Sequence, residues 1–218
     1  MSVMKNECCM EIDSKYYAYK SKSFAQRLFG HIGTVCKHKH HVRVACFKMG
    51  RYRQGIFHDM SKFSLTEFVP SVKYYSGTFS PNNVDRVLNG CSSSWLHHKG
   101  RNRHHFEYWI DFTPQKEPYV MGCRMPLKYV AEMVADRYAA CVAYNGKNYS
   151  KGDAWEYYAR GKGNHIIHPD TIAVLEKALA VMRDDGEDAA FAYMKSILKI
   201  TKGSDYSAES LGLPLRQE

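Results

Sequence analysis

The residues best suited to chemistry lie in one stretch, G-I-F-H-D-M-S-K-F-S-L-T-E, which runs from residue 55 to residue 67. His58 and Asp59 stand side by side at the end of its apolar run, and Lys62 follows three residues after the aspartate. A histidine and a carboxylate that are buried each need a polar partner. A divalent metal ion satisfies both, and a mixed nitrogen and oxygen set suits Fe, Mn, Co, Ni or Zn better than Ca or Mg. Taken alone, the pair fits either a metal site or a helix end with solvated side chains.

A second stretch, W-L-H-H-K-G-R-N-R-H-H-F-E-Y-W, begins at Trp95 and places four of the eleven histidines within nine residues. Gly100 and Asn102 disfavour one unbroken helix, so we expect the two histidine pairs to flank a turn. Neighbouring helical residues point about 100 degrees apart, so one member of each pair is expected to face inward. A solvated basic loop is the alternative. The aromatic residues that we expect in the core rather than in a pocket are Phe106, Tyr108 and Trp109.

Two long helices are expected to position these residues. An apolar repeat at steps of three and four predicts helix over residues 23–49, as one element or as two divided near its glycines. His31 and His38 share one face of it, two turns apart, whereas its other two histidines point elsewhere. The second helix is predicted over residues 126–144 and is apolar almost all round, which is typical of a helix packed on most sides.

Two carboxylates interrupt the apolar pattern of that second helix. Glu132 and Asp136 are four residues apart and therefore share a face. Carboxylates on a largely buried helix repel each other unless cations lie nearby. They indicate either a metal or cation site or a solvated face of the helix.

Among the remaining segments, the last two predicted helices are expected to be scaffold, whereas the loop at 76–94 is a candidate for part of a substrate entrance. A capping box of Ser64 and Glu67 predicts a short helix to about residue 75. We expect surface loops at 76–94 and 111–124 and further helices at 153–160, 170–183 and 187–199. The predicted fold class is all-α, with a lead-in over residues 1–22, one helical domain over residues 23–200 and a polar C-terminal tail over residues 201–218.

The composition is that of an ordinary globular chain. It has 218 residues, of which 44% are hydrophobic and 24% charged, and no apolar run of the roughly 20 residues that a bilayer span needs. The first residues lack a signal-peptide pattern, and seven cysteines without a C-x-x-C pair fit a reducing compartment, so we expect a cytoplasmic protein. Three of the cysteines are expected to be small core side chains: Cys36, Cys46 and Cys141.

The net charge of +9 predicts a surface that attracts anions. Nucleic acid is one such partner, but the basic residues are spread through the chain and no nucleic-acid-binding motif is present. A small phosphorylated molecule is therefore the favoured partner. The oligomeric state stays open.

The order of the candidate residues is a helical histidine, the His-Asp pair, the two histidine pairs and a helical aspartate. This order resembles the HD-domain superfamily of metal-dependent phosphohydrolases. The resemblance rests on F-H-D-M-S-K for the H-D-x-x-K core, on the upstream histidine, and on V-A-D-R-Y-A-A for the distal aspartate. From His31 to about Tyr149 the chain also resembles, more narrowly, an uncharacterised family of bacterial and phage proteins. That family brings no known reaction with it.

The superfamily resemblance implies a set of metal ligands. His38 matches the first ligand, although His40 is a competing choice. His58 and Asp59 match the doublet, and Asp136 matches the last ligand.

The additional histidines resemble the extra ligands of HD families that bind two ions. Asp59 would bridge the two ions, and His98 with His104 or His105 would hold the second one. The resemblance thus implies one or two divalent ions, and their identity stays open among Fe, Mn, Co, Ni and Zn.

The chemistry that follows is hydrolysis of a phosphate ester, because a metal-bound water becomes a hydroxide nucleophile near neutral pH. We expect a metal-dependent phosphohydrolase that acts on a nucleotide or another small phosphate ester. The expected catalytic residues are Asp59, Lys62 and Glu132, with Glu132 either orienting a ligand histidine or accepting a proton. The expected substrate-binding residues are Lys62, Lys99, Arg101 and Arg103.

Two other functions remain open from the sequence. Some HD-fold proteins with histidine-rich two-metal sites are di-iron oxygenases, and activity without oxygen, with Mn or Co in place of Fe, would exclude that reading. The third hypothesis is a binding or regulatory protein that keeps the metal for stability or ligand sensing.

Overall fold

The computed structural model describes residues 13–201 and 205–215. Its α-helices are α1 (Phe24–Lys48), α2 (Tyr52–Phe57), α3 (Leu65–Lys73), α4 (Pro81–Asn89), α5 (Ser93–Arg101), α6 (Leu127–Asn145), α7 (Asp153–Arg160), α8 (Pro169–Asp185) and α9 (Glu187–Ile200). Short 3-10 helices are η1 (Ser14–Ser21), η2 (Met60–Phe63), η3 (Phe106–Trp109), η4 (Gly146–Asn148) and η5 (Glu209–Leu211). The predicted all-α class is confirmed, and no helix in the described ranges is long and apolar enough to cross a bilayer.

The longest element is α1, which stays helical through both of its glycines. Ser23 begins it with a capping box, in which its hydroxyl accepts from the Gln26 N–H and the Gln26 side chain accepts from the Ser23 N–H. The segment is therefore one helix and is not divided near its glycines. Its buried residues recur every three or four positions and include His31 and His38, as the spacing predicts.

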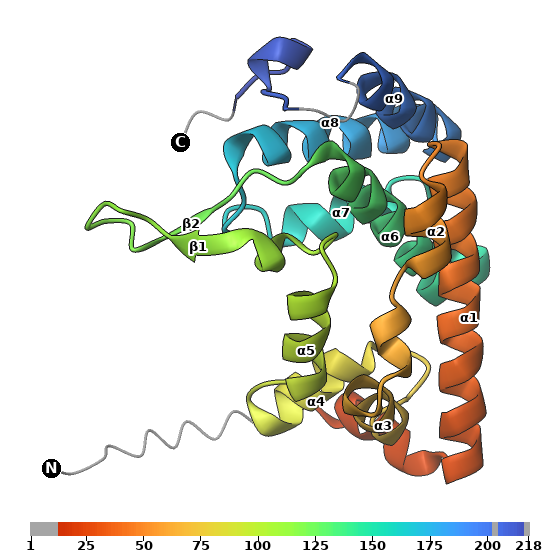
Figure 1. Cartoon of the computed structure of the whole chain (residues 1–218). Helices are drawn as coiled ribbons and strands as arrows, with labels where there is room; N and C mark the ends of the chain where they lie inside the picture. Colours follow the sequence, from red (N-terminus) through yellow and green to blue (C-terminus); the bar gives the residue numbers. More distant parts are fainter. Residues whose placement is uncertain (1–12, 202–204, 216–218) are drawn as a thin grey trace, which may run out of the picture.

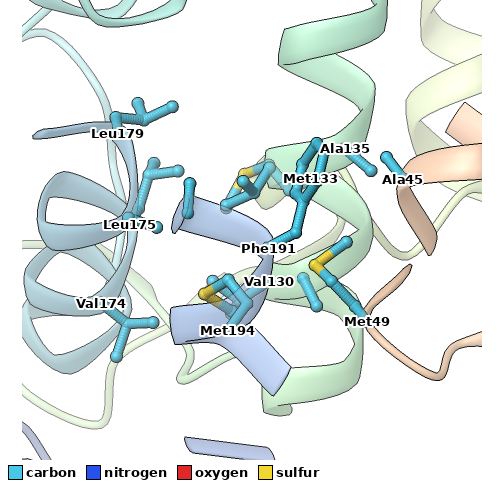
Figure 2. Close-up of a cluster of buried hydrophobic side chains, with 14 of the residues drawn as sticks. Ala45, Met49, Val130, Met133, Ala135, Val174, Leu175, Leu179, Phe191 and Met194 are labelled. Carbon is cyan, nitrogen blue, oxygen red and sulfur yellow. The ribbon is translucent and has the colours of Figure 1, made fainter. Parts of the chain in front are cut away.

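The main core lies between α6, α8, α9 and the C-terminal end of α1. Figure 2 shows Phe191 of α9 and Leu175 of α8 facing the side chains of α6, with Met49, the residue after α1, on the other side. Fully burying one such side chain contributes about 1.5–3 kcal/mol. This core fixes α6 against α1, and the two helices run side by side over much of their length (Figure 1).

A second group of helices lies beside the N-terminal half of α1. Its central member is α3, which packs on α1, α4 and α5 (Figure 1). The η1 helix joins this group through ring contacts of Tyr19 with Tyr74 and of Tyr16 with Phe79, each with centroids 5.4 Å apart. The short α2 and η2 helices connect the two groups. The His-Asp pair lies on this connection.

Two segments that were expected to be surface loops contain regular structure. Residues 76–94 include α4 and the start of α5, and Pro81 stands at the beginning of α4, where its missing N–H costs nothing. Residues 111–124 include most of an antiparallel hairpin of β1 (Ile110–Phe112) and β2 (Val120–Gly122). The loop expectation was wrong for these parts because short elements carry little periodic signal.

The C-terminal segment packs on the domain. Tyr206 and Ala208 are buried, and the Tyr206 hydroxyl donates to the Met125 carbonyl at 2.8 Å. Residues 202–204 and 216–218 of the predicted tail, like residues 1–12 of the lead-in, lie outside the described residues. Of the three cysteines expected in the core, Cys46 is buried and Cys141 half-buried, but Cys36 is exposed because it lies off the buried stripe of α1.

Candidate metal centre

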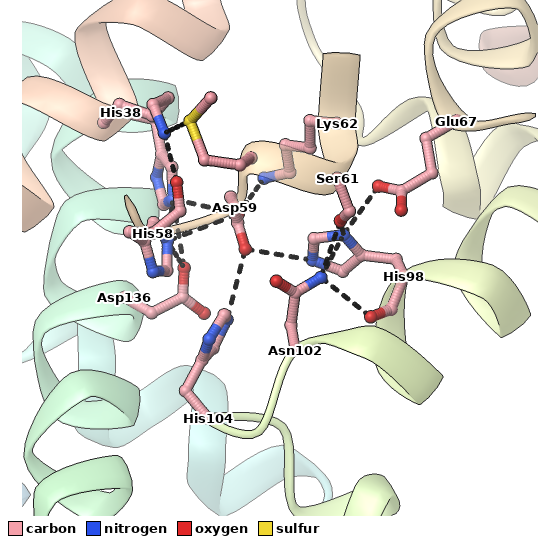
Figure 3. A network of polar contacts seen from close by, with 12 residues as sticks. His38, His58, Asp59, Ser61, Lys62, Glu67, His98, Asn102, His104 and Asp136 are labelled. Carbon is pink, nitrogen blue, oxygen red and sulfur yellow. Dashed lines mark hydrogen bonds and ion pairs between the residues drawn. The ribbon is translucent and has the colours of Figure 1, made fainter. Parts of the chain in front are cut away.

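Asp59 stands at the centre of a polar cluster and has an unusual backbone conformation. It is 1% exposed and has φ 52°, the one positive φ at a non-glycine residue in the described part of the chain. The left-handed conformation costs an ordinary residue about 1–2 kcal/mol. Such strain persists where the surroundings hold it, and it is concentrated at functional sites. It also ends α2 sharply and sends the Asp59 carboxylate into the interior (Figure 3).

One group of potential ligands lies on the Oδ2 side of Asp59. His38 Nε2 lies 3.0 Å from Asp136 Oδ1 and 3.3 Å from His58 Nε2. His58 Nε2 in turn lies 3.3 Å from Asp59 Oδ2 and 3.4 Å from Asp136 Oδ1. All four residues offer ligand atoms within 4.8 Å of one another. Metal–ligand bonds of about 2.0–2.2 Å place neighbouring ligands at such separations, so the group is of the right size for one ion.

A second group lies on the Oδ1 side of the same carboxylate. His98 Nε2 and His104 Nε2 each lie 3.4 Å from Asp59 Oδ1, and His105 completes the set. Asp59 Oδ1, His104 Nε2 and His105 Nε2 are buried and lack a hydrogen-bond partner within the described structure. Buried polar atoms without partners are costly unless an ion or a water molecule satisfies them. The donor set and its unpaired atoms therefore fit a second ion, with Asp59 shared between the two groups.

The geometry separates the two candidates for the first ligand. His38 belongs to the first group, whereas His40 is exposed and its Nδ1 lies 3.4 Å from the Arg43 guanidinium. One position along α1 turns the side chain by about 100 degrees, so two positions carry His40 away from the centre.

Glu132 holds two of the histidines from behind. Its Oε1 lies 2.9 Å from His58 Nδ1 and 3.2 Å from His104 Nδ1. With Nδ1 donating to the carboxylate, each ring keeps its Nε2 lone pair for the centre, the arrangement usual for metal-bound histidines. Glu132 is thus placed beside the ligands, as one of its two predicted roles requires. Its helical face is buried rather than solvated.

Glu67 holds His97 and His98 in the same way, a role that the sequence analysis did not predict. Its two oxygens accept from His97 Nδ1 and His98 Nδ1, each at 2.7 Å. The capping box predicted for this residue is absent, since the Ser64 side chain makes no cap hydrogen bond. The S-L-T-E pattern fits a cap and a buried carboxylate equally well. The signal available in the sequence was the run of histidines, because each buried imidazole N–H needs a hydrogen-bond acceptor.

Electrostatics in the centre favour charged carboxylates and a cation. Burial by itself would raise the pKa of Asp59. The positive charges of His58, Lys62 and His98 outweigh this effect and hold the pKa of Asp59 well below its usual range. For His58, burial is likewise outweighed by Asp59, Asp136 and Glu132, so its pKa is well above the usual value. A divalent ion would supply the positive charge that a proton on His58 otherwise provides.

Two other histidines are kept neutral. Burial is the main cause of the lowered pKa of His38 and of the strongly lowered pKa of His105. A neutral imidazole is the form that binds a metal ion.

The centre opens to solvent at one side. Asp136 and Lys62 keep 19% and 27% of their side-chain exposure, whereas His58 and Asp59 are almost completely covered. Lys62 Nζ lies 2.7 Å from Asp59 Oδ2, and the Asp59 charge raises the pKa of Lys62 against the effect of burial. Tyr144 is 42% exposed and lies near enough for the Lys62 charge to act on its phenol. We call Lys62, Asp136 and Tyr144 the mouth of the centre.

A separate cleft of about 630 Å³ adjoins the centre at Glu132 and His104. We call it the basic cleft, because its cationic lining residues are Arg51, Arg53, Arg101, Arg103 and Lys128. Of the predicted substrate-binding residues, Lys62 lies in the centre, Arg101 and Arg103 lie in this cleft, and Lys99 lines neither. Phe106 and Trp109 pack on the core as expected, whereas Tyr108 is exposed.

The chain matches a family described as a family of unknown function (DUF5662) over residues 27–181. The match includes every residue of the two ligand groups and both supporting glutamates. No curated protein and no solved structure matches the chain.

Proposed function

We propose that this chain, which belongs to that family of unknown function, is an HD-type metallohydrolase with two metal ions. Its substrate is a small phosphate ester, such as a nucleotide. The proposal rests on the site itself, because the description of the family names no reaction.

The observation that supports it most is the position of Asp59 between two ligand groups. Each of its oxygens faces a different set of buried histidines, with Oδ2 toward His58 and Oδ1 toward His98 and His104. A carboxylate in this position suits a bridge between two ions. The order of the ligands along the chain and their positions in helices or next to helix ends further support the HD resemblance.

Two bound ions would supply an activated water and stabilise charge on the phosphoryl oxygens of the substrate. The chain's own groups would do the rest. Lys62 lies in the mouth and would contact a phosphoryl oxygen while it keeps the Asp59 carboxylate in place. Glu132 would hold His58 and His104 in the tautomer that leaves Nε2 free.

A second candidate, a di-iron oxygenase, is favoured by the nitrogen content of the two groups. They contain five histidines, and imidazole is a ligand that suits iron. The two functions differ in their need for oxygen, and a binding protein would show metal without turnover.

The test begins with metal content. We expect about two equivalents of Fe or Mn per chain in the parent protein. A His38→Gln variant should lose metal, whereas His40→Gln, which changes an exposed histidine two positions away, should keep it. Elemental analysis of both variants beside the parent checks this pair.

Turnover is then measured on p-nitrophenyl phosphate and on bis(p-nitrophenyl) phosphate, with Mn and without oxygen. Asp59→Asn should lower the rate by more than about a hundredfold, because it removes the shared ligand. Turnover that requires oxygen and iron would replace the hydrolase by the oxygenase. A folded parent protein that takes up no metal would end both enzyme proposals.

A further inference from the structure

The basic cleft carries positive charge that the protein itself does not neutralise. Five cationic side chains line it, and within the described residues none of them forms an ion pair with a carboxylate. Arg101 instead donates to His97 Nε2 at 2.6 Å, and Arg103 donates to the Tyr129 hydroxyl at 3.3 Å. The one carboxylate in the lining, Glu132, is engaged by His58 and His104. Concentrated charge of one sign in a cleft attracts the opposite charge.

The cleft is distinct from the mouth of the centre. Its lining includes His104 and Glu132, but not His38, Asp59 or Asp136. His104 turns its Nε2 toward Asp59 and its Nδ1 toward Glu132. A molecule in the cleft would therefore contact the supporting side of the ligand shell, away from the atoms that face the ions.

The size and lining of the cleft define the class of ligand. A volume of about 630 Å³ suits a small molecule. Guanidinium groups pair with phosphate oxygens in a bidentate manner, and each phosphoryl group carries one to two negative charges near neutral pH. A single phosphate would leave most of the five cations without a partner. Two or more linked phosphoryl groups match the charge.

We propose that the basic cleft is a binding site for a small anion that carries at least two linked phosphoryl groups, separate from the metal centre. Arg53 from the start of α2 and Lys128 from the start of α6 hold it from two different elements. Because Glu132 borders the cleft and holds His58 and His104, the anion bound by the cationic side chains lies next to the support of both ligand groups.

The probe is inorganic triphosphate, with orthophosphate as the single-phosphate comparison. Binding to the full chain is measured by calorimetry after removal of metal by a chelator, so that neither turnover nor metal chelation contributes. We expect triphosphate to bind at least tenfold more tightly than orthophosphate. Arg53→Gln and Lys128→Gln should each weaken triphosphate binding about tenfold. Both side chains are exposed, so the variants should fold.

The control is Lys195→Gln, which removes an exposed charge from α9, outside the cleft. It should bind triphosphate as the parent does. Equal losses of triphosphate affinity in all three variants would show that only the net charge matters and would overturn the site. Parent-like affinity in Arg53→Gln and Lys128→Gln would overturn it as well. A ten-nucleotide single-stranded DNA that binds more tightly than triphosphate, with the same sensitivity to the two variants, would reassign the cleft to nucleic acid. The readout needs no reaction, so it stands whether or not the hydrolase proposal does.

Discussion

Glu67 and Glu132 divide the support of the histidines between them. Glu132 serves one histidine from each ligand group, whereas Glu67 serves His98 and its neighbour His97. Removal of Glu67 therefore acts on one group of ligands, and removal of Glu132 acts on both. This asymmetry makes Glu67 the more selective probe.

Glu67→Gln should reduce the metal content from about two equivalents to about one. An amide is uncharged and has one acceptor oxygen in place of two, so the hold on His98 weakens while His38, His58 and Asp136 keep their contacts. Elemental analysis beside Glu156→Gln, which changes an exposed glutamate on α7, checks the result. Two equivalents in Glu67→Gln, or none, would show that Glu67 does not act on one group alone.

His31 gives the fold its own dependence on pH. Burial, with a smaller effect of the Lys62 charge, lowers the pKa of His31 to about 4, and its ring packs against Phe68 and Tyr75. The unfolded chain takes up a proton near pH 6.5, before the folded chain does. Stability from this residue is thus complete above pH 6.5 and is lost as the pH falls toward 4.

The prediction is that the parent loses up to about 2 kcal/mol more stability than His31→Phe between pH 7.5 and pH 5. Phenylalanine cannot take up the proton and suits an aromatic environment. Urea unfolding at the two pH values measures the difference, and protonation of the other histidines is common to both proteins. Equal losses of stability in the two proteins would mean that His31 takes up its proton at the same pH in the folded and the unfolded chain.

At this scale, residue types and spacing identified the cluster but not its internal geometry. His58, Asp59 and Asp136 were foreseen because their side chains interrupt apolar patterns. The position of Glu67 and the left-handed backbone of Asp59 depend on how helices distant in sequence pack, and no local pattern encodes that.

Elements were predictable where the apolar period was long enough to read. The bounds of α7 are those expected, and α6, α8 and α9 differ from expectation by one or two residues. The helix α4 was missed because it begins with Pro81, Asn82 and Asn83, residue types that are typical of turns. The β1–β2 hairpin was missed because strands of three residues give almost no periodic signal. Ser80-Pro81 was a usable signal for the start of α4, since proline favours the first turn of a helix.

Two glycines should respond in opposite ways to replacement by alanine. Gly33 is exposed within α1, and an added Cβ would meet nothing within 4 Å. Gly33→Ala should stabilise the fold by about 0.5–1 kcal/mol. At Gly122 of β2, a Cβ would lie 2.6 Å from the His168 nitrogen and 2.7 Å from the Ile167 carbonyl carbon.

Gly122→Ala should therefore destabilise the fold by about 1–3 kcal/mol, because backbone must move to make room. Urea midpoints of the two variants and the parent test both signs. Equal effects at the two positions would show that the hairpin does not dock closely on the segment before α8.

Over the whole molecule, charge is divided unevenly along the chain. Between residues 14 and 106 there are 16 lysine and arginine residues and three acidic residues, Asp59, Glu67 and Asp85, all of which are buried. The exposed part of this half therefore offers cations without exposed carboxylates to balance them. The net charge of +9 gave the sign of the surface, but only the burial of these three carboxylates shows where it is concentrated.

The two ligand groups also connect α5 and the turn after it to α1 and α6, with which α5 shares few other contacts. Ligand residues come from α1, from the α2–η2 connection, from α5 with the turn that follows it, and from α6. An ion that binds the folded chain and not the unfolded one adds about 2.7 kcal/mol of stability at a free concentration 100 times its Kd. Removal of metal with a chelator should therefore lower the thermal midpoint of the parent by about 5–10 °C. Asp59→Asn, which lacks the shared ligand, should melt at the same temperature with and without chelator. Elemental analysis must first show that the chelator has removed the metal. If the metal-free parent then kept its thermal midpoint, the ions would not link the two helical groups. The packing of α1 on α6 would in that case hold the centre together by itself.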